Sequence, residues 1–292
     1  MPPHRVVITG ALTRDAVHAL ADERGLHLSL CHASGWNGEG LALLPALSDA
    51  LEHLDIEHFL GLDVSVVNAL PRLRSLTLGG EVRGTVALTL LQGLGIYAKA
   101  GRVRLGGQPQ RLTRLAGTLN SAALETCAST GLLQSLILVK SRLVKLPDAS
   151  LLSHLEQLQL FTVSGLTSIG PALQSRSLQY LRANGCRALS ITTPVTSRTL
   201  KYFALNDCNE ISSLDLLGAA PSLQAVSLLG GTSIGDRRIA HVVRQGHIKD
   251  LRWVPKPGYD ITVDQLPSDP DTALRLVREM ESAGVHAVGQ NQ

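Results

Sequence analysis

A six-residue pattern, L-x-x-L-x-L, recurs along this chain at nearly constant spacing and limits the folds that the chain can adopt. Ten copies are present, and successive copies start 18 to 25 residues apart. The copies begin at Leu51, Leu73, Leu91, Leu112, Leu133, Leu155, Leu178, Leu200, Leu223 and Ile248. A repeat of this period predicts a solenoid in which each copy forms one coil and stacks on its neighbours.

The spacing of the leucines within one copy predicts a short β-strand. The last two leucines alternate with other residues, so they point to one side of the strand and the residues between them point to the other. Stacked coils then form a parallel sheet over a continuous core. The return segments, such as residues 162–177, are rich in Ser, Thr, Gly and Pro and predict turns or one-turn helices. The expected fold class is an α/β solenoid, an arc with a concave parallel sheet and short turn or 3-10 segments on its convex side.

The copies between Leu51 and Val254 resemble the leucine-rich-repeat family. That family places Asn or Cys eight residues after the first Leu, where this chain has Asn120, Cys186 and Cys208. Other copies depart from this rule and carry Ser141, Val163 and Gly231. The resemblance implies a rigid scaffold that binds a protein or peptide on its concave face, as regulators, inhibitors and pathogen effectors of this family do.

Residues 1–50, ahead of the solenoid, predict an N-terminal capping unit, since an uncapped coil would expose half of its core. Segment 5–10 reads as a strand, 13–25 as a helix and 26–31 as a second strand, which together form a βαβ-like unit. The first strand is followed by one glycine where the dinucleotide-binding fingerprint needs three. We therefore expect a cap here and no cofactor.

Residues 255–292 predict a C-terminal cap with a helix at 271–284 and a loose tail. Leu274, Val277 and Met280 recur at helical spacing behind an acidic start. The simplest expectation is that this helix closes the open end of the core. The alternative is that it docks onto a partner.

Three adjacent copies gather aromatic, amide and arginine side chains at positions predicted to face the concave side. Only 3% of the chain is aromatic, so their collection there is informative. The predicted binding residues are Gln157, Gln159, Phe161, Tyr180, Arg182, Asn184, Tyr202 and Asn206. Aromatic residues with Arg and amides are typical of interface hot spots. The competing interpretation is that strands simply favour aromatic residues, which pack well across neighbouring strands.

A smaller polar cluster lies in the first copy, where His53, Asp55 and Glu57 alternate along the predicted strand and share one face. They could bind a metal ion or a basic partner, or form only a solvated edge. A second hypothesis makes the chain an enzyme, with acid–base groups from this cluster or from Tyr180 and Arg182. No GxSxG, HExxH or GxxxxGK[ST] motif supports that hypothesis.

The composition narrows the remaining classes of function. The net charge is +3, from 27 basic and 24 acidic residues, which is too balanced for a nucleic-acid surface. No apolar run approaches membrane-spanning length, no secretory leader is recognised, and the 4 cysteines form no CxxC pair. We expect a soluble, cytoplasmic, non-catalytic protein- or peptide-binding module without metal, cofactor, membrane or nucleic acid.

Overall fold

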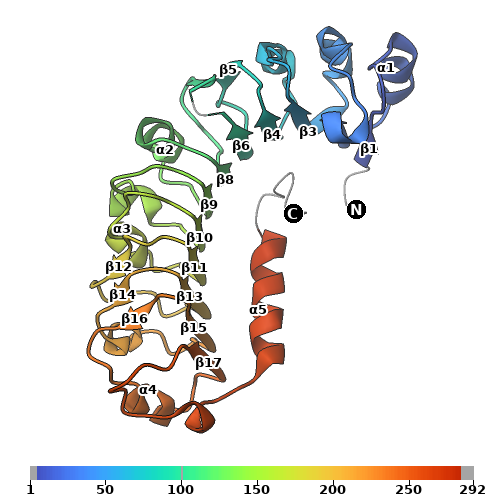
Figure 1. Ribbon diagram of the computed structural model, residues 1–292. Helices are drawn as coiled ribbons and strands as arrows, with labels where there is room; N and C mark the ends of the chain where they lie inside the picture. Colours follow the sequence, from blue (N-terminus) through green and yellow to red (C-terminus); the bar gives the residue numbers. More distant parts are fainter. Residues whose placement is uncertain (1–4, 100, 284–292) are drawn as a thin grey trace. The chain divides into compact units, whose positions relative to one another are not determined.

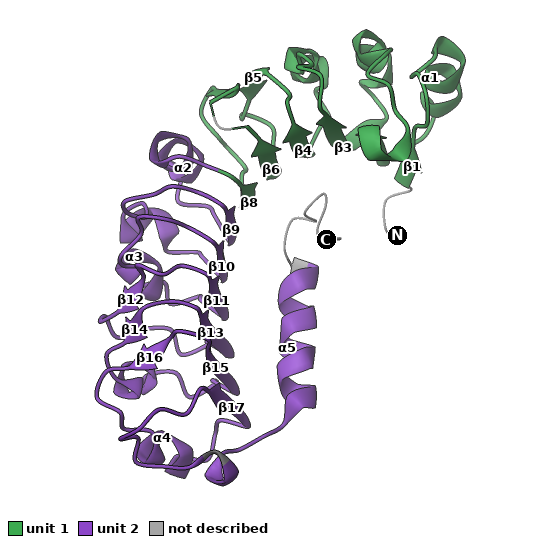
Figure 2. Ribbon diagram, in the orientation of Figure 1, with its two compact units in different colours: residues 1–118, 285–292 green, residues 119–284 purple. Residues whose placement is uncertain are grey.

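The computed structural model describes residues 5–99 and 101–283 (Figure 1). The described chain falls into two compact units, unit 1 up to Thr118 and unit 2 from Leu119 (Figure 2). In both units a strand of the sheet is followed by a turn, a short helix or a 3-10 segment, and then by the next strand. All ten copies of the repeat supply a strand, so the predicted repeat and its parallel sheet are confirmed.

In the described part of unit 1, the main sheet has six parallel strands, paired in the order β1(Arg5–Val7), β2(Leu26–Cys31), β3(Leu51–His58), β4(Ser75–Gly80), β6(Gly93–Ala98) and β8(Arg114–Gly117). A smaller parallel pair joins β5(Gly84–Ala87) to β7(Val103–Gly106). The short helical elements of this unit are α1(Arg14–Leu20), η1(His32–Ser34), η2(Leu41–Leu47) and η3(Ser65–Ala69).

Unit 2 repeats the arrangement with the parallel order β9(Ser135–Val139), β10(Gln157–Phe161), β11(Tyr180–Asn184), β13(Tyr202–Asn206), β15(Ala225–Leu229) and β17(Asp250–Trp253). A second small sheet joins β12(Ser190–Ile191), β14(Glu210–Ile211) and β16(Ser233–Ile234). The helical elements are α2(Ser121–Ala128), η4(Ala149–Leu152), α3(Gly170–Leu173), η5(Leu214–Leu217), α4(Ala240–Arg244), η6(Val263–Gln265) and α5(Pro270–Ala283).

The core of each unit is built from the repeat leucines. Leu54 and Leu76 are buried in unit 1, and Leu158, Leu181 and Leu205 are buried in unit 2. Full burial of one such side chain stabilises the fold by about 1.5–3 kcal/mol. Because side chains alternate along a strand, the residues between these leucines point to the opposite sheet face. This is the face that the sequence predicts to be concave, and we call it the outer face because it lies outside the leucine core.

The Asn and Cys residues at the family position play two different roles. Cys186 and Cys208 are buried in the core, and their thiols lie 3.8 and 3.7 Å from the carbonyl oxygens of Leu160 and Ala183. Both therefore act as small core residues. Asn120 instead stays exposed and caps α2, because its Oδ1 accepts the Ala123 N–H at 2.9 Å.

The N-terminal segment forms the predicted strand, helix and strand, although the helix is shorter than residues 13–25. The Thr13 hydroxyl accepts the Ala16 N–H at 3.2 Å and caps α1, which ends at Leu20. A turn then leads to Gly25 and into β2. β2 pairs with β3, so this segment continues the sheet of the repeats.

The prediction that the C-terminal helix closes the open end of the core is wrong. α5 packs on the outer face of the unit 2 sheet (Figure 1). Its buried stripe is Ala273, Leu276 and Met280, with Val277 partly buried against it, which follows the i, i+3, i+4, i+7 spacing of one helix face. Leu274, predicted to lie in that stripe, is 54% exposed. The predicted loose tail lies outside the described residues.

The last residue of β8 yields a test of the coil geometry. Gly117 has a φ of +129°, and a methyl group on its Cα would collide with the carbonyl oxygen of Ile96. Gly25 also has a positive φ, +71°, but its Cβ position is open. We expect Gly117→Ala to lower the free energy of unfolding by roughly 3 kcal/mol or more. Gly25→Ala should cost about 1–2 kcal/mol. Chemical denaturation followed by circular dichroism measures both, and equal losses would contradict this account.

Candidate functional site: the outer face of unit 2

The strand register places the predicted binding residues in three rows that run across neighbouring strands. The first row is Gln157, Tyr180, Tyr202 and Ala225, the second is Gln159, Arg182, Ala204 and Ser227, and the third is Phe161, Asn184, Asn206 and Leu229. Within each row, neighbouring residues come from successive coils, as the repeat spacing predicts. All eight predicted residues therefore share one sheet face, opposite the leucine core.

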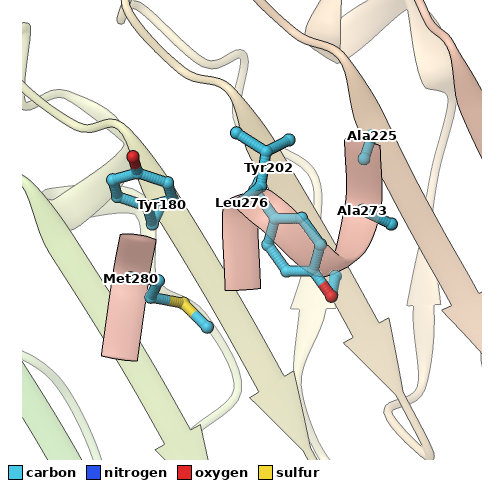
Figure 3. Close-up of a cluster of buried hydrophobic side chains, with 7 residues drawn as sticks. Tyr180, Tyr202, Ala225, Ala273, Leu276 and Met280 are labelled. Atoms are coloured by element: carbon cyan, nitrogen blue, oxygen red, sulfur yellow. The ribbon is translucent and has the colours of Figure 1, made fainter. Parts of the chain in front are cut away.

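α5 covers the first row. Tyr180 and Tyr202 are only 7% and 8% exposed, and they form one buried cluster with Leu276 and Met280 of the helix. Met280 lies by Tyr180, and Leu276 lies by Tyr202 (Figure 3). Ala204 and Ala225 belong to the same cluster, and these short side chains leave room for the bulky stripe of α5 beside the tyrosine rings.

A buried glutamine caps the C-terminal end of α5. Gln157 is 2% exposed, and its Nε2 donates to the backbone carbonyl of Met280 at 2.9 Å. That carbonyl lies in the last turn of the helix, where backbone oxygens have no partner within the helix. The Oε1 of Gln157 accepts from the hydroxyl of Ser135 at 3.2 Å. The side chain is thus hydrogen-bonded at both ends, which fixes its orientation toward the helix.

Two further polar contacts join α5 to the strands and to the residues just before them. The Tyr180 hydroxyl donates to Oε2 of Glu279 at 2.7 Å, and Arg275 donates to Oε1 of Gln224 at 3.0 Å. Burial, and then the bond to Glu279, raises the pKa of Tyr180. The same hydrogen bond lowers the pKa of Glu279. Lys201 lies over the Tyr180 ring, with its Nζ 5.6 Å from the ring centroid.

The remaining predicted residues lie in the second and third rows, and most of them stay partly exposed. Gln159 is buried, whereas Phe161, Arg182, Asn184 and Asn206 keep part of their surface in solvent. We call these last four residues the open strip. The Arg182 guanidinium lies 5.3 Å from the centroid of the Phe161 ring, a cation–π distance. Within the described residues, Nε of Arg182 is buried and has no hydrogen-bond partner.

Sequence reasoning did not place the α5 side chains in this site. Leu276, Glu279 and Met280 belong to it because they contact the first row. The sequence did contain a signal that this helix packs against a surface, because the apolar residues of α5 have the spacing of one complete helix face. The unusually small Ala204 and Ala225, beside two tyrosines, also mark a place where a bulky element fits.

The smaller polar cluster on unit 1 is engaged by neighbouring strands. Asp55 pairs with His27 at 2.8 Å and with Arg5 at 3.5 Å, and both partners lie on preceding strands. Glu57 accepts a hydrogen bond from the thiol of Cys31 at 2.9 Å. Burial, and then the charge of His27, lowers the pKa of His53. The carboxylates therefore stabilise the contact between β2 and β3, and the enzyme hypothesis built on them stays a prediction.

Neither a metal centre nor a membrane span is found in the described part of the chain. Across residues 5–99 and 101–283, no three His, Cys, Asp or Glu side chains are placed to hold a metal ion. Of the helices that the structure describes, none combines the length and apolar character needed to span a lipid bilayer.

Two leucines on opposite sides of α5 give a matched test of its docking. Leu276→Ala removes a fully buried side chain and should weaken docking by about 2–4 kcal/mol. Leu274→Ala changes an exposed side chain and should alter it by less than about 0.5 kcal/mol. Amide hydrogen exchange across residues 270–283 should accelerate only in the first variant. Equal exchange in the two variants would show that the buried stripe does not hold the helix.

Comparison with known proteins identifies the fold. No family model matches this sequence, and no curated protein matches it. Among solved structures, an internalin (InlF) from Listeria monocytogenes, itself a leucine-rich-repeat protein, is similar to this chain with a TM-score of 0.56 at 15% sequence identity. The similarity covers 99% of this chain and 88% of the internalin chain. At this identity the likeness is one of fold, and the fold of this chain is the leucine-rich-repeat α/β solenoid.

Proposed function

We propose that the chain is a non-catalytic protein- or peptide-binding module, acting as a regulator, inhibitor or effector through the outer face of unit 2. One observation carries the proposal: this face already binds a helix, its own α5. It does so with two buried tyrosines, two alanines beside them and a buried glutamine that caps the helix end. Such a combination of aromatic anchors and oriented polar groups is typical of recognition surfaces.

The open strip extends this surface beyond α5. Phe161 and Arg182 combine a large apolar ring with a cation, and Asn184 and Asn206 add amide groups. Arg182 is partly exposed, and a partner that places a carboxylate or carbonyl oxygen against its guanidinium would gain a charge-assisted hydrogen bond, so the strip favours an acidic or backbone-presenting ligand.

We further propose that the protein works in a reducing compartment such as the cytoplasm. Its four cysteines are free thiols in the structure, and Cys127, Cys186 and Cys208 are buried. The thiols of Cys186 and Cys208 donate to backbone carbonyl oxygens in the core. Free thiols persist where glutathione and thioredoxin keep them reduced, which supports this assignment.

The open strip gives the test of the binding function. The double variant Phe161→Ala, Arg182→Ala should lower capture of the partner from native lysate at least tenfold, since hot-spot truncations typically cost 2 kcal/mol or more. Val144→Ala, at a side chain 78% exposed in a turn of the same unit, is the matched control and should leave capture unchanged. Quantitative mass spectrometry of the captured proteins measures the effect. If every captured protein is recovered equally by the double variant, the partner does not use the open strip.

A further inference from the structure

We infer that the first row of the unit 2 outer face is a receptor for an acidic amphipathic helix of a partner protein, and that α5 is an internal occupant which this helix displaces. The inference rests on the proposed binding function and adds the chemistry of the ligand and its competitor. It is carried by the contacts of α5, which show what the face accepts.

The way in which α5 is held favours its displacement. Its apolar contact consists of one stripe, and Leu274 and Arg278 on its other side are exposed. A helix of 14 residues is marginal in isolation, so its order depends on that single stripe and a few polar contacts. Elements with few buried apolar contacts open most readily.

The tether allows α5 to leave the face without unfolding the repeats. The chain before it is fixed to unit 2, since Asp260 accepts the Ile239 N–H at 2.7 Å and the carbonyl of Pro267 accepts the Leu251 N–H at 3.0 Å. Asp269 caps the helix through the Thr272 N–H at 3.2 Å, and Pro270 occupies its first turn. The pivot is therefore confined to the two residues between Pro267 and Pro270, and the strands of the sheet do not depend on the helix.

The face beneath α5 also tolerates exposure to water. Its first row contains the phenol groups of Tyr180 and Tyr202 and the amide of Gln157, rather than the leucines and valines of the core. Tyrosine and amide side chains are suited to surfaces that are alternately wet and covered, because their polar atoms find water when no partner is present. A permanent cap on a hydrophobic core would have no need for these polar groups.

The contacts of α5 define the helix that fits. It presents small, large and large apolar residues at Ala273, Leu276 and Met280, which fill the space beside the two tyrosines. It presents a carboxylate, Glu279, to the Tyr180 hydroxyl, and its last-turn carbonyl to Gln157. This is recognition of a helix by its apolar face, with anchors at i, i+3 and i+7.

The charge around the face favours an acidic helix. Lys201 lies against Tyr180, and Arg182 follows Tyr180 by two residues on the same face. α5 meets these cations with Glu279 and uses Arg275 for the bond to Gln224, whereas its exposed Arg278 offsets part of its negative charge. A partner helix with the same apolar stripe, a donor at the position of Arg275 and an acidic residue at that of Arg278 would bind more tightly than α5.

A peptide-binding experiment on the full chain tests the inference. The probe is a fluorescent peptide of residues 270–283 with Arg278→Glu, which keeps the Arg275 contact to Gln224, and binding is measured by anisotropy. Tethered α5 competes at an effective concentration on the order of millimolar, so the unmodified chain should bind the probe weakly. The chain variant Leu276→Asp, Met280→Asp, in which α5 is undocked, should bind it at least tenfold more tightly. Leu274→Asp, at the exposed side of α5, is the matched control and should behave as the unmodified chain.

Two further measurements keep the result interpretable. Hydrogen exchange across residues 270–283 verifies undocking, and Met280→Ala provides a milder variant that should give an intermediate gain if the double variant melts early. A probe carrying Leu276→Asp and Met280→Asp should not bind. Equal affinity for the probe in undocked and unmodified chains would overturn the inference. The inference would also be overturned if the unmodified chain had the molecular mass of a dimer and the probe converted it to a monomer. In that case α5 would be exchanged between two copies of the chain.

The experiment separates this inference from the proposed function. If lysate capture depends on Phe161 and Arg182 but probe affinity does not rise on undocking, the binding function is supported and the displacement of α5 is contradicted. If probe affinity rises on undocking but lysate capture does not depend on the open strip, the displaced helix is supported and the binding role of the open strip is contradicted.

Discussion

The burial of leucines between stacked coils is the interaction on which the rest of this molecule depends. Each coil gains its core only by contact with the next, and the parallel strand register follows from that contact. Because side chains alternate along a strand, fixing Leu158 and Leu181 on the core side also fixes Gln157 and Tyr180 on the other. The rows of the outer face are therefore a consequence of core packing, and they form a rigid surface before any ligand binds.

This dependence explains what the sequence could predict. The strand positions follow from the local period alone and were predicted correctly, and the same period aligns Tyr180 with Tyr202. The location of α5 depends on contacts between residues far apart in the chain, such as Tyr180 and Glu279, 99 residues apart. No local pattern encodes such a pairing. The partners of Asp55 were missed for a related reason, since Arg5 and His27 lie outside the repeats and their register with β3 is not set by the leucine period.

The position of α5 changes the interpretation of the aromatic residues. Tyr180 and Tyr202 were predicted as exposed anchors, and the structure buries them under a helix of the same chain. Both interpretations rest on one property: tyrosine packs against an apolar surface while its hydroxyl keeps a polar partner. Glu279 is that partner for Tyr180 here. The features that suit these residues to an external ligand are thus the features by which they hold an internal one.

The division of the outer face into a covered row and an open strip has a kinetic consequence. A ligand that had to wait for α5 to leave would associate no faster than the helix opens, because its whole site would be hidden. Phe161 and Arg182 stay accessible while α5 is docked, so a partner can first attach to them. Attachment raises the local concentration of its helix at the first row and makes competition with the tethered α5 effective. Under the proposed function, the open strip would supply the initial encounter, and the covered row would supply selectivity for a helix with the matching apolar stripe and charge.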